Sequence, residues 1–510
     1  MNSPAATLAP DMLTTLGSRS ISAVFWGAGG TVLRMLLQIG AQIMLARLLG
    51  PDQYGVFAIA ATVISFSAFF SDVGLAYGLI QKPQITERDI RFVFTWQVLL
   101  GAGVSGLVWL AAGPVAAFFG EPRAEAVLRA LSVLCVLNAL AAPALNLLKR
   151  EIDFKRIHIA HLISYLIGYG VVGVPLGFLG AGVWALVAAW VVQAVFNLLL
   201  LFSASRHSLR PLLWHEGARH QARYGGTVFV TNLVNWMISN VDRITVGRVF
   251  GSHEIGLYAT AYNLLYTPAA AGLGVVQPVF FAASSRVADD EPRIMRGYFA
   301  LVGAVAVFAL PVFVLVAVAA EAFIGTLYGP QWLAAAALCR PIALAMPFFL
   351  VWGFTTPLLW TGGQAAREFM VQIPIALAWC GVCVVAAQHS VLALAWCVLG
   401  LFALRCAVVM VAASRVVKLP MAALWQSVRG GLAVSAVIAV AVALVDHGLA
   451  VYAPGLRFVA CCAVTAVLWW AVLRAAPSLI CADLAQLTGR LHLRLPGWLQ
   501  PHLAFLASRD

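Results

Sequence analysis

Seven charged residues interrupt the long apolar segments of this chain, and their types and positions favour binding rather than covalent chemistry. They are Arg34, Asp72, Arg129, Asp242, Arg243, Arg340 and Arg405. A charged group within a bilayer is costly, so it usually faces a partner or a water-filled cavity. Arginine can hold a phosphate group through two parallel hydrogen bonds. Because most of these residues are arginines, the pattern predicts a path for an anionic cargo.

Six of these residues form the predicted substrate-binding set, with no catalytic residue among them: Arg34, Asp72, Arg129, Asp242, Arg243 and Arg340. We expect Arg34, Arg243 and Arg340 to line one central cleft. One alternative stays open, because Arg34 and Asp72 lie on neighbouring predicted helices and could form a purely structural ion pair. Asp242 and Arg243 are adjacent in sequence, so their side chains point in different directions on a helix and each needs its own partner.

Composition sets the class of protein that these charges belong to. Of the 510 residues, 62% are hydrophobic and only 10% are charged, against about a quarter charged in soluble domains. The chain is therefore expected to be an all-α polytopic membrane protein. Fourteen apolar segments are long enough to cross a bilayer: 22–49, 54–80, 92–119, 125–148, 157–178, 181–203, 224–250, 254–281, 296–320, 332–360, 368–387, 390–413, 428–446 and 455–474.

A short stretch occurs twice, at an offset of 201 residues. Residues 46–60 and 247–261 align so that Arg47 matches Arg248, Gly50 matches Gly251, Gly55 matches Gly256, Ala58 matches Ala259 and Ala60 matches Ala261. Each copy ends one apolar segment, turns on a glycine and begins the next, and internal repeats of this length indicate architecture. Six predicted spans separate the copies, so both face the same side of the membrane. This predicts two parallel six-helix bundles, related by a pseudo-two-fold axis along the membrane normal.

The basic residues predict the orientation. Twenty-three of the 32 lysines and arginines fall at the termini and in one set of alternate loops, whereas the other set holds only Arg123 and Arg457. The positive-inside rule then places both termini in the cytoplasm. The expected organisation is a cytoplasmic segment (1–21), a bundle (22–203), a cytoplasmic linker (204–223), a second bundle (224–413), two further transmembrane helices (414–474) and a cytoplasmic amphipathic tail (475–510).

Several classes of chemistry find no support in the sequence. The chain has no Gly-rich phosphate loop of the Walker type. His158 and His161 are spaced for a shared metal but lack an evident third ligand. Cys380 and Cys383 have CxxC spacing without a second pair. We therefore expect no enzyme activity, no metal, no cofactor and no nucleic-acid partner.

Four stretches carry a resemblance to a known family. They are Phe70–Gln81 (FSDVGLAYGLIQ), Asp153–Ile157 (DFKRI), Gly256–Asn263 (GLYATAYN) and Tyr328–Trp332 (YGPQW). Together they resemble the bacterial polysaccharide-transport flippases, within the superfamily that also holds multidrug-extrusion and lipid II flippases. The resemblance extends over about residues 15–420. Of the predicted binding residues, only Asp72 falls inside a matched stretch.

The resemblance implies a function and a location. It implies a flippase that moves undecaprenyl-diphosphate-linked oligosaccharide repeat units across the bacterial inner membrane by alternating access. The expected partners are that lipid-linked cargo, the bilayer, and a polysaccharide polymerase with its co-polymerase. Two alternatives stay open: a multidrug or organic-cation antiporter on the same scaffold, and a membrane glycosyltransferase or polysaccharide polymerase. The antiporter needs an acidic lining, for which only Asp72 and Asp242 are available, and the enzyme needs larger extramembrane loops.

Overall fold

A computed structural model describes residues 10–72, 75–77, 79, 84–214, 218–287, 289–361, 365–417 and 419–486. Within helices, the side chains of residues 10–28, Asp72, Tyr77, 218–232 and 365–369 lie outside the description, as do the first nine residues and most of the predicted tail. The chain divides into two compact units. The first holds Met1–Leu49 and Val56–Trp236, and the second holds Gly50–Gly55 and Met237–Asp510. The predicted bundle limits remain predictions.

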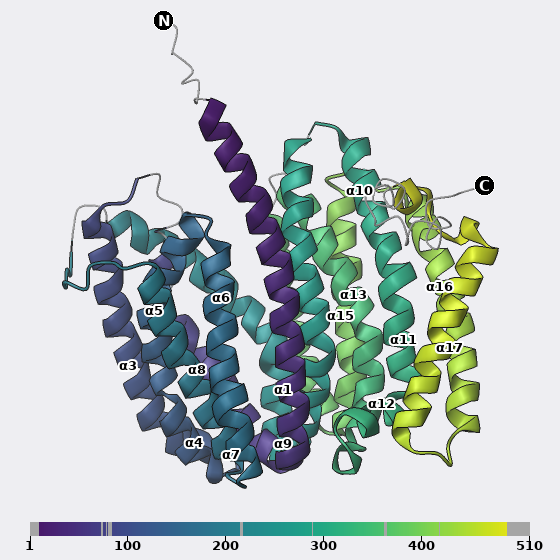
Figure 1. The fold of residues 1–510 in the computed structure, drawn as a ribbon, viewed down its shortest axis with the longest axis horizontal. Coiled ribbons are helices and arrows are strands. Elements are labelled where there is room, and N and C mark those ends of the chain that lie inside the picture. Colours follow the sequence, from purple (N-terminus) through teal and green to yellow (C-terminus); the bar gives the residue numbers. More distant parts are fainter. Residues whose placement is uncertain are drawn as a thin grey trace, which may run out of the picture. The chain divides into compact units, whose positions relative to one another are not determined.

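The first unit is built from antiparallel helices that stand side by side (Figure 1). They are most of α1 (Pro10–Asp72), η1 (Leu75–Tyr77), α3 (Glu87–Phe119), α4 (Arg123–Leu131), α5 (Val133–Arg150), α6 (Phe154–Tyr165), the π-helical η2 (Leu166–Gly173), α7 (Val174–Phe178), α8 (Val183–Ala204) and the start of α9 (Ala218–Arg286). Polar side chains define the starts of two of them. Thr86 and Asp89 form a capping box on α3, and Asp153 caps α6. These contacts satisfy backbone N–H groups that a helix leaves unpaired.

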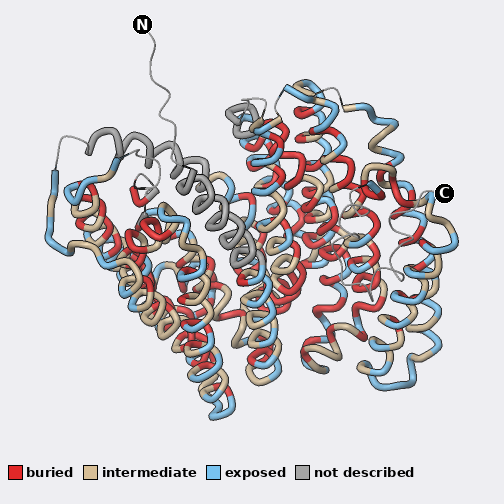
Figure 2. The backbone as a smooth tube through the Cα atoms, turned by 45° about the horizontal axis from the view of Figure 1, so that its top comes forward, coloured by how far each residue is buried: buried red, intermediate tan, exposed pale blue. Residues whose placement is uncertain are grey.

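The second unit continues the helical pattern. It holds the rest of α9, α10 (Glu291–Ala304), the π-helical η3 (Val305–Ala309), α11 (Leu310–Val318), α12 (Ala320–Leu327), η4 (Pro330–Trp332), α13 (Ala335–Thr361), α14 (Ala365–Ala386), α15 (Val391–Ser414), α16 (Met421–Gly448), α17 (Pro454–Ala475) and η5 (Pro477–Leu479). Buried residues run along the inner faces of these helices (Figure 2). The outward faces of α14, α16 and α17 expose valine and leucine side chains, as lipid-facing helices do.

The expected all-α membrane fold is confirmed, and the fourteen predicted spans all have counterparts. Eleven stretches of helix in the described part of the chain are long and apolar enough to cross a bilayer. Gly29–Ser71 and Leu233–Arg286 each contain two predicted spans. The shorter apolar helix Met370–Ala386 supplies the remaining one. The protein is therefore a multi-pass membrane protein.

The repeated stretch forms the same structure twice. Gly50 and Gly251 occupy equivalent positions, and each interrupts a long helix with a positive φ, 75° and 84° respectively. Glycine adopts this backbone conformation without the steric cost that a side chain would add. Each long helix is thus two spans joined at a glycine corner. The repeat read from the sequence corresponds to a structural repeat.

The two C-terminal spans are anchored to the second unit by a side chain and a backbone irregularity. The indole Nε1–H of Trp469 on α17 donates to the carbonyl oxygen of Val307, at 2.8 Å. Val307 lies in the π-helical turn η3, where the regular hydrogen-bond ladder of the helix is altered. At the other end of α17, Arg457 pairs with Asp446 of α16 at 2.8 Å. These contacts hold α17 against η3 and against α16.

Candidate functional site

A buried carboxylate in the second unit has a tyrosine as its hydrogen-bond donor. The Tyr258 hydroxyl donates to Asp242 Oδ2 at 2.5 Å, and both residues are buried. The two residues lie on either side of the Gly251 corner of α9, which folds one arm of the helix back on the other. The second carboxylate oxygen, Oδ1, has no hydrogen-bond partner among the described residues. Burying a polar atom without a hydrogen-bond partner costs free energy, so packing does not explain a carboxylate at this position.

The neighbouring residue, Arg243, points elsewhere and finds separate partners, as the sequence predicted. Its Nη2 donates to Asn263 Oδ1 at 2.9 Å. Its guanidinium carbon lies 4.8 Å from the centre of the Tyr262 ring. Both partners come from the arm of α9 that follows the corner. Arg243 and Asn263 are only half-buried, so this pair keeps hydrogen-bonding capacity for a ligand.

A row of aromatic rings leads from this arginine to a second one. Tyr258, Tyr262 and Tyr266 follow one another at helical spacing, with ring centres 6.2 Å and 5.5 Å apart. Tyr266 then meets Phe349 of α13 at 5.1 Å. Phe349 in turn meets Trp352, at 5.7 Å. Rings of this kind offer flat apolar faces edged with polar groups, which suits the C–H faces and hydroxyls of a sugar.

Arg405 ends the row. It is 3% exposed, and its guanidinium carbon lies 3.7 Å from the centre of the Trp352 ring. Its Nε donates to Gln372 Oε1 at 2.9 Å. Arg243 and Arg405 are thus both held by one amide and one aromatic ring. We call Asp242, Arg243, Tyr258, Tyr262, Tyr266, Asn263, Phe349, Trp352, Gln372 and Arg405 the polar–aromatic row.

The first unit carries its own membrane-embedded arginine. Arg34 Nη1 lies 3.2 Å from His161 Nδ1, which joins α1 to α6. One turn earlier on α1, Gly30 packs against the His158 ring, where a Cβ would lie 2.7 Å from Cγ. The absence of a side chain at Gly30 therefore allows the close approach that brings Arg34 to His161. Because Nδ1 faces a guanidinium, it is badly placed to bind a metal cation.

For five of the six predicted residues the structure shows different local partners. Arg129 pairs with Glu125 at 2.7 Å and lies over the Trp109 ring, and Arg340 pairs with Glu321 at 2.9 Å. Both arginines are close to half-exposed. Asp242 and Arg243 lie together in the second unit, and Arg34 lies in the first. The Asp72 side chain lies outside the described residues, so its expected role and its pairing with Arg34 remain predictions, as does the single cleft.

Sequence reasoning missed most of the partners. His161, Tyr258, Tyr262 and Asn263 were not assigned to the site, nor was Gln372. The tyrosines gave a usable signal, because three of them recur every fourth residue directly after a glycine corner. Gln372 gave none, since its partner is 33 residues away on another helix.

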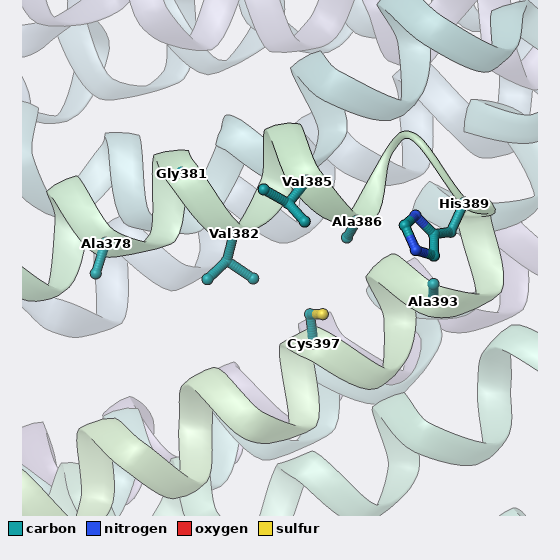
Figure 3. A pocket seen from close by; sticks show the side chains of 8 residues that line it. All are labelled: Ala378, Gly381, Val382, Val385, Ala386, His389, Ala393 and Cys397. Atoms are coloured by element: carbon teal, nitrogen blue, oxygen red, sulfur yellow. The ribbon is translucent and has the colours of Figure 1, made fainter.

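An apolar groove lies between α14 and α15 (Figure 3). It is lined by Ala378, Gly381, Val382, Val385, Ala386, His389, Ala393 and Cys397. Its lining is almost entirely hydrocarbon, with His389 at one end of it. The groove suits an acyl chain and lacks the charged groups that a head group would need.

Comparison with known proteins places the chain in a family of polysaccharide biosynthesis proteins. Residues 44–337 match the family described as polysaccharide biosynthesis protein. The succinoglycan biosynthesis transport protein ExoT of Rhizobium meliloti is 25% identical, over 66% of this chain and 68% of that protein. The lipopolysaccharide biosynthesis protein WzxC of Escherichia coli is 23% identical, over 62% of this chain and 65% of that protein. The matched regions thus span about two thirds of these relatives.

Solved structures share the fold. The lipid II flippase MurJ in an inward closed conformation has a TM-score of 0.72 at 13% identity, covering 89% of this chain and 99% of MurJ. An inward-facing multidrug resistance transporter of the MATE family, in the MOP superfamily, has a TM-score of 0.60 at 12% identity. It covers 76% of this chain and 94% of that transporter. At these identities the likeness concerns the fold alone.

Proposed function

Because this chain is a member of the polysaccharide biosynthesis protein family, we propose that it is a flippase for lipid-linked oligosaccharides. Its cargo is an undecaprenyl-diphosphate-linked repeat unit, which it moves from the cytoplasmic to the periplasmic leaflet of the bacterial inner membrane by alternating access. The repeat unit is then used for exopolysaccharide, capsule or lipopolysaccharide, and a polysaccharide polymerase with its co-polymerase receives it. The distribution of basic residues supports cytoplasmic termini.

The physical task explains why a protein is needed. Moving one hydroxyl group into hydrocarbon without a hydrogen-bond partner costs roughly 2–7 kcal/mol, so an oligosaccharide cannot cross unaided. A path lined with polar and aromatic groups removes most of this cost. The lipid tail can stay in the bilayer throughout. No bond in the cargo has to break, so the proposed function requires binding and conformational change rather than catalysis.

The polar–aromatic row is the observation that carries the proposal. It places two membrane-embedded arginines at the ends of a series of aromatic rings. Arg243 is half-buried and still has donors for a phosphate oxygen, and Asn263 beside it can bind a sugar hydroxyl. Of the rings between the arginines, Tyr266 and Trp352 are half-buried and can provide stacking surfaces, whereas Tyr262 and Phe349 are buried. Such a combination suits a sugar diphosphate better than an organic cation.

Arg34 is the proposed counterpart in the first unit. A neutral His161 accepts a hydrogen bond from Nη1, which orients the guanidinium and leaves its remaining donors for an anion. Arg34 and Arg243 are therefore the first choice for phosphate contacts. Arg129 and Arg340 each have a glutamate partner, so we place them second, at the periplasmic entrance.

Transport across a defined bilayer tests the proposal. Proteoliposomes are loaded with a labelled undecaprenyl-diphosphate oligosaccharide, and its appearance in the opposite leaflet is followed for the wild type, Arg34→Ala and Arg243→Ala. Arg415→Ala is the matched control, because it removes an exposed arginine that follows α15. We expect transfer with the wild type and the control, and at least tenfold slower transfer with the other two.

Other outcomes show whether the proposed function or only the proposed binding site is wrong. Normal transfer by both Arg34→Ala and Arg243→Ala would keep the flippase and remove these residues from its path. Absence of transfer under any ion gradient, together with export of cationic dyes, would replace the proposal by a multidrug antiporter.

A further inference from the structure

The segment that joins the two groups of six predicted spans is fixed to the first unit. Residues 205–214, which we call the strap, lie without helical structure along the start of α3 (Figure 1). Arg91 donates from Nε to the carbonyl oxygen of Arg210 and from Nη2 to that of Pro211, both at 3.2 Å. The backbone N–H of Leu212 donates to Thr95 Oγ1 at 2.8 Å. The Trp96 indole donates to the Leu213 carbonyl at 3.1 Å.

The first half of the strap is held by packing. The His207 ring lies between Phe94 of α3 and Phe202 of α8, with centres 5.5 Å and 5.2 Å away. Just before it, Arg156 reaches the carbonyl oxygen of Ala204. Side chains of α3 and α8 therefore hold the strap by its backbone groups and by one ring, which leaves most of its other side chains facing outward.

The position of the strap along α3 gives its depth in the membrane. Its contacts fall on Arg91, the last charged residue of α3, to Trp96, and the part of α3 that follows the polar Gln97 runs from Val98 to Phe119 without a charge. At a rise of 1.5 Å per residue, that part spans roughly 33 Å, close to the roughly 30 Å of a hydrocarbon core. The strap therefore lies just outside the core, in the layer of lipid head groups.

The outward face of the strap has the composition of a membrane-interface anchor. Leu209, Leu213 and Trp214 are 52%, 60% and 67% exposed. Arg206 and Arg210 alternate with them and are exposed. Exposed apolar residues on a soluble surface would be unfavourable, but leucine and tryptophan beside arginine are what the bilayer interface favours.

Charge decides which lipid fits. Arg88, Arg91, Arg156, Arg206 and Arg210 lie on the strap or at the starts of α3 and α6, and the described acidic groups at these helix starts are Glu87, Asp89, Glu151 and Asp153. Asp89 is buried in the capping box of α3, and Asp153 is paired with Arg156. The excess of arginine therefore remains available to phosphate groups.

We propose that the strap is a binding site for the head groups of anionic phospholipids, with Arg206 and Arg210 contacting phosphate while Leu209, Leu213 and Trp214 insert among the first methylenes. This anchor fixes the first unit at one leaflet. It does not depend on the cargo that the protein carries, so it can hold or fail independently of the flippase proposal.

Association with spin-labelled lipids tests the site. The full chain is reconstituted in phosphatidylcholine, and the immobilised fractions of spin-labelled phosphatidylglycerol and phosphatidylcholine are compared. We expect the wild type to prefer phosphatidylglycerol, and R206Q/R210Q to lower that preference roughly fivefold or more, since each basic residue near an anionic surface contributes by about that factor. The preference should also fall at high salt. R293Q/R296Q, which removes two exposed arginines from α10, is the matched control and should keep the preference.

Three results would overturn the proposal. One is equal association of the two lipids with the wild-type chain, which would mean that the strap faces water or another protein. Another is an undiminished preference in R206Q/R210Q. The third is an equal loss in the control pair, which would show a general charge effect. Thermal unfolding of each variant verifies that the chain is folded, and the salt dependence of the wild type tests whether the lipid preference is electrostatic.

Discussion

Gly55 and Gly256 occupy equivalent positions in the two repeats, and each packs against the backbone of the other copy. A Cβ at Gly55 would lie inside van der Waals contact with the carbonyl oxygen of Ser252, and one at Gly256 would do the same with Pro51. Pro51 and Ser252 are themselves equivalent at the offset of 201 residues. So are Asp52 and His253, whose Oδ2 and Nδ1 atoms lie 3.3 Å apart. The repeats thus cross reciprocally, as two copies related by a local two-fold axis do.

Alanine at either crossing glycine should destabilise the protein. In a helix interior, alanine is normally favoured over glycine by about 1 kcal/mol. Overpacking against a backbone carbonyl costs about 1–3 kcal/mol, so the net effect of Gly55→Ala or Gly256→Ala should be a lower melting temperature in detergent. Gly274→Ala is the control, because a Cβ there meets nothing within 4 Å. A melting temperature equal to that of the control would contradict the close crossing.

Tyr258→Phe should lower the free energy of unfolding more than removal of an equally buried tyrosine hydroxyl elsewhere does. The substitution leaves the Asp242 carboxylate without its hydrogen-bond donor, so we expect the free energy of unfolding to fall by about 1–3 kcal/mol. Tyr328 is 1% exposed and its hydroxyl has no hydrogen-bond partner in the described structure, so Tyr328→Phe should be nearly neutral. Denaturant unfolding compares the two. Equal losses would mean that the Tyr258–Asp242 hydrogen bond contributes no net stability.

Arg405→Lys should be destabilising although it keeps the charge. Lysine lacks the planar group that lies over Trp352 and the Nε that donates to Gln372. The substitution removes a hydrogen bond made by a charged group and a contact with an aromatic ring. Together these changes should lower the free energy of unfolding by about 2 kcal/mol. The exposed Arg415→Lys serves as control. If thermal unfolding shows both variants to be unchanged, the guanidinium geometry is unimportant.

Acid should loosen the strap. Burial between two phenylalanine rings lowers the pKa of His207, although its hydrogen bond with the Ser208 carbonyl opposes this. A lowered pKa means that the unfolded segment binds a proton more readily than the docked one, so docking is stable at neutral pH and weakens as pH falls below about 6.5.

Hydrogen exchange of the Leu212 amide measures this effect, because that amide donates to Thr95 across the strap contact. After correction for intrinsic rates, we expect protection to decrease between pH 7.5 and pH 5.5 in the wild type. His207→Phe keeps an aromatic ring in place without a titrating group, so its protection should stay constant. A decrease of the same size in that variant would assign the pH dependence to another group.

The sequence by itself determined the class of protein, the number of spans and the internal repeat. These follow from local properties, because hydropathy over about 20 residues decides whether a segment can cross a bilayer and a glycine corner needs only its own backbone freedom. The four family motifs also depend on local sequence. This is why fourteen spans and two equivalent corners, at Gly50 and Gly251, could be predicted without coordinates.

Only the tertiary structure decided which partner each membrane-embedded charge has. Arg34 meets His161 across 127 residues, and Arg405 meets Gln372 across 33. A charge in a membrane must find a partner or a cavity, but helix packing selects which one, and packing depends on side chains from distant segments. For the same reason a linker with few local signals became a docked strap, held by Arg91, Thr95 and Trp96 on a helix more than 100 residues earlier.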